Sequence, residues 1–155
     1  MGIGGRQVYR RLTKEEKEKL NLELLPERDH VQVYKDSFDL LVFVYRTTAS
    51  MSREYRYTLA EEMKHSLQQL LTAIYEAKKT TPRTALIMEA MHWTYEAKVL
   101  YRTMDELHLL KDWQCAVYIL QLASISKQLT AWHRYETRKE KENDKKDTAP
   151  AGGNS

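Results

Sequence analysis

The chain has 155 residues, with 25 Lys and Arg against 22 Asp and Glu, so its formal net charge is +3. Its mean hydropathy of −0.67 predicts a soluble protein rather than a membrane-spanning one. None of its five glycines lies between Arg6 and Ala151. Phosphate-cradling loops and tight strand turns need glycine, which excludes nucleotide-binding loops and a turn-rich sheet. The composition therefore predicts an all-helical protein with short loops and room for a single domain.

The chain contains one cysteine, Cys115. One thiol can form neither an internal disulfide nor a cysteine-based zinc site. No Ser/His/Asp or Cys/His arrangement stands out, so we expect no catalysis and no cofactor. The first residues lack the apolar stretch of a secretory signal, and Arg6 stands where a myristoylation motif needs Ser or Thr. We therefore expect a cytoplasmic protein.

Residues 1–30 form a charged N-terminal arm. Thr13 and Glu16 have the spacing of a capping box, which predicts a short helix that runs to about Leu25 and ends at Pro26. The charge of this arm indicates weak packing against the rest of the chain.

Four longer helices follow, over residues 31–139. The first is predicted from about Val31, with Asp29 as its N-cap, to Thr48. The second is predicted from Thr58, which has Glu61 three residues on, to about Lys79. Short connections between long helices predict an antiparallel up-down-up-down four-helix bundle.

The third helix is predicted to begin at Pro82 and to reach about Leu110. The fourth is predicted from Trp113, capped by Asp112, to about Lys139. Residues 140–155 are a charge run followed by a polar tail, a composition that predicts disorder.

Each bundle helix has an apolar row at helical spacing, which predicts its inward face. The rows are Tyr34, Phe38, Leu41, Tyr45 and Thr48; Leu59, Met63, Leu67, Leu70 and Ile74; Leu86, Ala90, Trp93, Ala97, Leu100, Met104 and Leu107; and Cys115, Ile119, Leu122, Leu129 and Trp132.

Two helices carry apolar residues away from these rows. Leu40 and Phe43 lie opposite the row of the first helix, and Val117 and Leu120 lie opposite the row of the fourth. A helix of a single bundle needs only one apolar face. The four residues therefore predict a second interface and a homo-oligomer, with scattered surface apolar residues as the alternative.

Glu62 with His65, and Glu89 with His92, have the Glu-x-x-His spacing of di-iron bundles. At ~100° per residue, however, both histidines point away from the apolar rows. Since a di-metal site needs buried ligands, a metal-dependent oxidase bundle is the weakest of the three functional hypotheses considered, and we predict no metal ligand.

Basic residues gather at the helix ends. In the predicted bundle, two groups meet at one end: Lys78, Lys79 and Arg83, and Arg134, Arg138 and Lys139. Arg46, Arg53 and Arg56 gather at the other end. Such clusters suit a phosphate backbone, although Lys and Arg in a last helical turn also complement the helix dipole.

Three segments carry a family resemblance. The first helix reads Tyr-Lys-Asp-Ser-Phe-Asp-Leu-Leu-Val-Phe-Val-Tyr over residues 34–45. Arg56-Tyr57-Thr58-Leu59-Ala60 opens the second helix, and Leu129-Thr130-Ala131-Trp132 closes the fourth. Over about residues 31–135 the chain resembles a four-helix-bundle superfamily. That superfamily contains the proteins encoded in ribosomal RNA intervening sequences and the accessory variability proteins (Avd) of diversity-generating retroelements. Here Ala60 and Thr130-Ala131 replace the usual glycines. The long Leu/Ala-rich second helix and Trp132 resemble Avd more closely.

The resemblance implies a non-enzymatic accessory subunit. Avd-like proteins form a positively charged pentameric barrel that binds the retroelement reverse transcriptase and the template-repeat RNA during mutagenic cDNA synthesis. From the helical wheel and the topology, we predict nucleic-acid or polymerase contact at Arg53, Arg56, Lys78, Lys79, Arg83, Arg134, Arg138 and Lys139, and subunit contact at Leu40, Phe43, Val117 and Leu120. The alternative is a structural or interaction bundle of the ribosomal intervening-sequence type.

Overall fold

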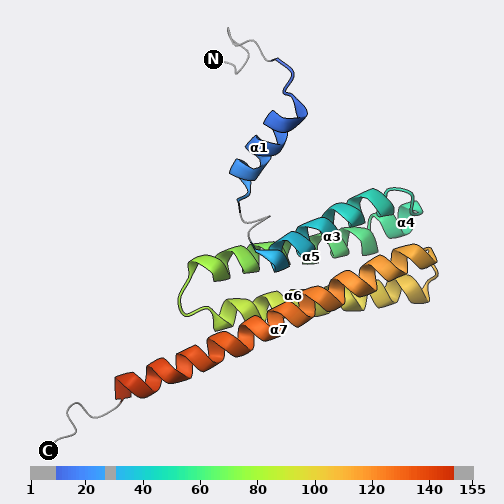
Figure 1. Ribbon diagram of the computed structural model, residues 1–155. Coiled ribbons are helices and arrows are strands. Elements are labelled where there is room, and N and C mark those ends of the chain that lie inside the picture. Colours follow the sequence, from blue (N-terminus) through green and yellow to red (C-terminus); the bar gives the residue numbers. More distant parts are fainter. Residues whose placement is uncertain (1–9, 27–30, 149–155) are drawn as a thin grey trace, which may run out of the picture.

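The computed structural model describes residues 10–26 and 31–148, and this part of the chain forms helices without any strand (Figure 1). The all-helical prediction is confirmed. Within the same residues, no helix is long and apolar enough to cross a membrane. The helices are α1 (Lys14–Leu24), α3 (Gln32–Thr48), α4 (Arg53–Arg56), α5 (Leu59–Lys79), α6 (Thr84–Glu106) and α7 (Asp112–Thr148).

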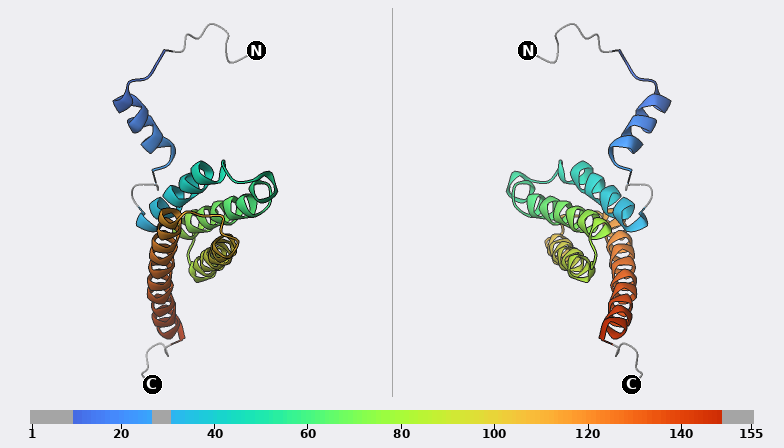
Figure 2. Two further views of the ribbon diagram at one scale, coloured as in Figure 1. Left: turned by 90° about the vertical axis from the view of Figure 1, so that its right-hand side faces the viewer. Right: turned by 90° about the vertical axis from the view of Figure 1, so that its left-hand side faces the viewer.

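The four long helices pack around one core. α3 contacts α5, α5 contacts α6, α6 contacts α7, and α7 returns to contact α3. The last part of α7 projects beyond the α5–α6 connection (Figures 1 and 2). α1 buries none of its residues, in line with the weak packing expected of the arm.

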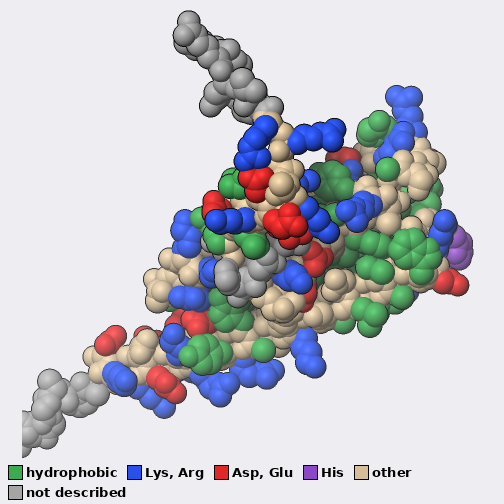
Figure 3. Space-filling view, turned by 45° about the horizontal axis from the view of Figure 1, so that its top comes forward, with side chains coloured by type: hydrophobic (Ala, Val, Ile, Leu, Met, Phe, Trp, Pro, Cys, Tyr) green, Lys and Arg blue, Asp and Glu red, His purple; other side chains and the backbone are tan. Residues whose placement is uncertain are grey.

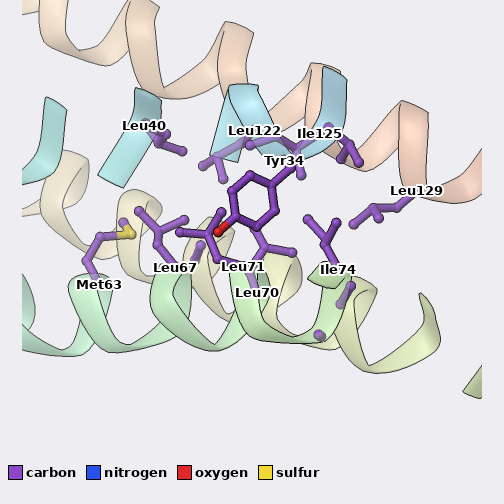
Figure 4. Close-up of a cluster of buried hydrophobic side chains, with 14 of the residues drawn as sticks. Tyr34, Leu40, Met63, Leu67, Leu70, Leu71, Ile74, Leu122, Ile125 and Leu129 are labelled. Carbon is purple, nitrogen blue, oxygen red and sulfur yellow. The ribbon is translucent and has the colours of Figure 1, made fainter. Parts of the chain in front are cut away.

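The core is filled by aliphatic side chains from all four long helices (Figure 4). Leu40 of α3, Leu67 of α5 and Ile125 of α7 are completely buried. Burying one such side chain contributes roughly 1.5–3 kcal/mol to folding. Together the side chains of this cluster hold the helices in place.

Helix starts follow local capping. Thr13 caps α1: its hydroxyl accepts the backbone N–H of Glu16, while the Glu16 carboxylate accepts the backbone N–H of Thr13. The predicted capping box is confirmed there. α5 begins after Thr58 as predicted, but the Thr58 hydroxyl donates to the Glu54 carbonyl, so the expected box with Glu61 does not form. The predicted cap Asp29 lies outside the described residues, and α3 begins after Val31.

α6 is shorter than predicted at both ends. It begins at Thr84, two residues after Pro82, and ends at Glu106 rather than near Leu110. His108 takes a left-handed conformation with φ of 57°. The His108 N–H donates to the Asp105 carbonyl and the Leu109 N–H to the Met104 carbonyl. This pair of bonds is a Schellman motif, which ends a helix even though glycine is the usual residue there.

α7 is longer than predicted. It begins at Asp112 and continues to Thr148. The predicted disorder from Glu140 is therefore wrong as far as Thr148, and residues 149–155 lie outside the described part of the chain. The lysines and glutamates of this stretch have good helix propensity, and the stretch contains neither Gly nor Pro, which accounts for the continuation.

Three inward rows differ from those predicted. Tyr45, Leu107 and Ile119 were expected in the core, but their side chains are 48%, 44% and 51% exposed. Val44 and Tyr118 are buried instead. The buried rows are rotated from the predicted ones, because α3 and α7 pack against each other as well as against α5 and α6. They are Val33, Ser37, Leu40, Val44 and Thr48 in α3, and Tyr118, Leu122, Ile125 and Leu129 in α7.

Candidate nucleic-acid interface

The predicted basic residues of one end are brought together where the α5–α6 connection meets α7. Arg83 Nε lies 3.3 Å from the carboxylate of Glu136, and Lys139 Nζ lies 3.9 Å from the same carboxylate. Glu136 is only 7% exposed. An almost buried carboxylate needs a cation beside it, so Arg83 and Lys139 partly neutralise Glu136.

Glu140, one turn further along α7, accepts a hydrogen bond from the Thr84 hydroxyl at 2.9 Å. Together with the Arg83–Glu136 ion pair, this bond ties α7 to the start of α6. Glu136 and Glu140 therefore stabilise the joint between the two helices. The contribution of Arg83 to this end is structural.

Lys78 and Lys79 are exposed at the end of α5. The Lys79 ammonium donates to the Tyr75 hydroxyl at 3.1 Å and lies 4.6 Å from the centre of that ring. Lys78 lines a small groove with Val31 and Trp132. Both cations therefore lie near the joint, at the end of α5.

The most extended basic surface runs along α7. Arg134 and Arg138 are exposed and form no ion pair with any described carboxylate. Three further lysines share their face, because all five positions fall within about 60° at ~100° per residue. We call this set the α7 basic row: Lys127, Arg134, Arg138, Lys141 and Lys145.

Basic side chains project along the lower edge of α7 (Figure 3). Glu136 and Glu140 lie on the opposite side of the helix, toward α6. Lys141 and Lys145 were not predicted because residues 140–155 were expected to be disordered, and Lys127 was not predicted because basic residues were sought only at the helix ends. The signal for the row was the spacing of its five members, which follow one another after seven, four, three and four residues.

The other predicted cluster is looser. Arg46 and Arg53 are exposed. Arg56 donates to the Ala49 carbonyl at 3.1 Å, and its guanidinium lies 5.2 Å from the centre of the Tyr57 ring. Arg56 therefore holds the connection between α3 and α5, and Arg46 and Arg53 are the exposed members left in this predicted cluster.

The predicted subunit contacts divide between core and surface. Leu40 is completely buried within one chain, so its assignment to a subunit interface is wrong: α5 and α7 both cover that side of α3. Phe43 is partly buried and packs edge-on against Trp113 and Tyr118. Val117 is partly buried, whereas Leu120 is 69% exposed.

The groups considered for chemistry are dispersed. His65 and His92 are exposed and lie edge-on against Trp93. Over residues 10–26 and 31–148, no cluster of three or more His, Cys, Asp or Glu could hold a metal ion. Desolvation raises the pKa of the Cys115 thiol, which lies 3.5 Å from the Asp105 carboxylate. A thiol with a raised pKa is a poor nucleophile at neutral pH.

Comparison with known proteins yields no assignment. No family model matches the chain, and no curated protein matches it.

Proposed function

We propose that this protein is a non-catalytic, cytoplasmic accessory subunit that binds a retroelement reverse transcriptase and its template RNA during mutagenic cDNA synthesis. The RNA part of this proposal rests on the α7 basic row. Five cations follow one face of a single helix, while the carboxylates of Glu136 and Glu140 face α6. A linear array of cations suits a phosphate backbone, because each neutralised phosphate releases counterions.

The assembly proposed with this function is a ring of such chains, with five copies as in Avd-like proteins. Each subunit is an up-down-up-down bundle of α3, α5, α6 and α7, which the order of their contacts supports. The exposed apolar side chains of Trp113, Ile119 and Leu120 on α7 support a contact between copies. Repetition around a ring would place several basic rows on one RNA–polymerase complex.

The first test removes two charges from the row. We expect the double variant Arg138→Gln, Lys141→Gln to bind a fluorescent single-stranded RNA more weakly. We also expect the slope of log affinity against log salt concentration to become shallower by about 1.4, since each phosphate contact contributes about 0.7 for single strands. Fluorescence anisotropy over a series of salt concentrations measures both.

Lys14→Gln, Lys17→Gln is the matched control, because it removes the same charge from exposed positions of α1. Arg46→Gln, Arg53→Gln tests the opposite end of the bundle. Equal losses in all three variants would show that net charge, and not the α7 row, attracts the RNA. Absence of RNA binding by the unmodified protein would overturn the proposed function.

The reverse-transcriptase part is tested by affinity purification from the native host, followed by mass spectrometry and RNA sequencing. We expect a reverse transcriptase together with one structured non-coding RNA. Recovery of ribosomal components would instead favour a bundle of the ribosomal intervening-sequence type.

A further inference from the structure

A shallow groove of about 560 Å³ lies between α6 and α7 at the upper end of the basic row. We call it the α6–α7 groove. Three cations line it, together with two hydroxyl side chains and two alanines, and no carboxylate is among its lining residues. They are Lys98 from α6 and Ala123, Ser126, Lys127, Thr130, Ala131 and Arg134 from α7.

Small side chains on α7 account for the depth of the groove. Ala123, Thr130 and Ala131 are exposed, and their short side chains form the floor of the groove. The longer side chains of Lys98, Lys127 and Arg134 form its walls. The Lys98 ammonium donates to the Ser126 hydroxyl at 2.8 Å. This bond crosses from α6 to α7 and holds the ammonium at the wall of the groove.

The charge of the groove is uncompensated. None of Lys98, Lys127 and Arg134 forms an ion pair with a carboxylate of the described residues. Elsewhere on the same two helices, cations do find carboxylates: Arg102 pairs with Glu106 at 2.9 Å and Lys139 with Glu136 at 3.9 Å. Three cations held around one groove repel one another, and an anion between them would relieve that repulsion.

We propose that the α6–α7 groove binds a phosphate group, and that this group belongs to a nucleic-acid strand which continues along the α7 basic row. A phosphate group offers several oxygens, which can accept bonds from an ammonium, a guanidinium and a hydroxyl at once. Arg138, Lys141 and Lys145 extend the positive surface from the groove toward the end of α7. The assignment of the phosphate group to a nucleic-acid strand rests on the proposed function. The phosphate site itself rests on the groove alone.

A nucleic acid fits this surface better than a protein does. Protein interfaces are anchored by buried aromatic or aliphatic side chains near their centre. Between its cations the groove offers only two alanines, a serine and a threonine. The surface therefore attracts by charge and not by apolar burial, which is how sequence-independent binding to a phosphate backbone works.

The test uses the full chain and a fluorescent 12-nucleotide single-stranded RNA. We expect Lys98→Gln, Lys127→Gln to lower the affinity and to reduce the salt slope by about 1.4. The control Lys14→Gln, Lys17→Gln should change neither by a comparable amount. Because Lys98 bridges two helices, a thermal melt accompanies each variant, and Lys127→Gln alone serves if the double variant does not fold.

A second variant leaves the charge unchanged. Ala131→Leu places a larger side chain on the floor of the groove at an exposed helical position. We expect it to weaken RNA binding while the melting temperature is retained. RNA binding that is unchanged in both Lys98→Gln, Lys127→Gln and Ala131→Leu would overturn the groove proposal, even where Arg138→Gln, Lys141→Gln confirms the proposed function.

Calorimetric titration with inorganic phosphate distinguishes the sources of the phosphate group. Binding of RNA that the groove variants weaken, with or without a response to inorganic phosphate, supports a strand in the groove. The unmodified protein could instead bind inorganic phosphate but no RNA, with Lys127→Gln abolishing the heat of phosphate binding. That result would support the phosphate site and overturn the proposed function. If the unmodified protein binds neither RNA nor inorganic phosphate, both the groove proposal and the proposed function are overturned.

Discussion

At the scale of single residues, Tyr118 carries the most perturbed buried group of the bundle. Its ring is completely buried, stacked on Tyr101 and edge-on to Phe43. Its hydroxyl has no hydrogen-bond partner of acceptable geometry within the described residues. The neighbouring Thr47 hydroxyl donates to the Phe43 carbonyl. Burial raises the pKa of Tyr118 to about 12, although Thr47 opposes this shift.

The raised pKa determines the direction of the pH effect. In the unfolded chain a tyrosine titrates near pH 10, so the folded state favours the neutral phenol. The contribution of Tyr118 to stability is therefore complete below about pH 10 and is lost as the pH rises through about 12.

We expect Tyr118→Phe to be more stable than the unmodified protein by about 1 kcal/mol at pH 7, because it removes a buried hydroxyl that has no partner. The variant should also lose less stability between pH 10 and pH 12. Urea denaturation at pH 7, 10 and 11 measures both effects. A less stable variant at pH 7, or an identical alkaline loss, would show that the hydroxyl is satisfied in solution.

At the scale of elements, the charged composition at the end of α7 is compatible with disorder and with a helix. Its last residues are mostly charged, which favours disorder when no apolar surface is available. The lysines and glutamates among these residues are good helix formers. Glu142 and Lys146 also stand four apart in the favourable order. The contacts of Glu136 and Glu140 with α6 provide a formed helix on which the next turns can propagate.

A variant that ends at Glu140 tests whether the end of α7 serves RNA binding without contributing to the stability of the fold. None of residues 141–147 is buried, so we expect the melting temperature to stay within about 2 °C of that of the full chain. The truncated protein lacks Lys141 and Lys145, and its salt slope for RNA should fall by about 1.4. Differential scanning calorimetry and anisotropy measure the two quantities. A large drop in melting temperature would show that the extension packs against something in solution.

At the scale of the whole molecule, the outer face of α7 changes character along its length. Near the α6–α7 connection it exposes Trp113, Ile119 and Leu120, each more than half exposed. From Lys127 onward it exposes cations. The apolar part suits contact with another protein surface, and the basic part suits a polyanion. One helix thus carries both surfaces that the proposed assembly requires.

The apolar part is tested with Leu120→Glu, at the most exposed of these positions. We expect the protein to self-associate and this variant to shift it toward the monomer, because a carboxylate is costly to bury in an apolar contact. Size-exclusion chromatography with light scattering gives the mass. Met88→Glu, at an exposed position of α6, is the matched control. A monomeric unmodified protein would contradict the proposed ring.

The sequence alone was sufficient to predict the helical class, the α1 capping box and the limits of α3 and α5 to within one or two residues. These features are local: helical periodicity, capping spacing and the lack of internal glycine act within a few residues of the chain. The end of α6 was missed because His108 adopts a conformation that sequence patterns assign to glycine.

Only the tertiary structure decided which face of each helix is buried and which cations lie together. Leu40 was placed on a surface because periodicity identifies one apolar row, whereas α3 is covered from two sides. Likewise Lys98 and Lys127 line the same groove only because α6 packs against α7. Contacts between residues far apart in sequence depend on how whole helices pack, and no local pattern in the chain encodes that arrangement.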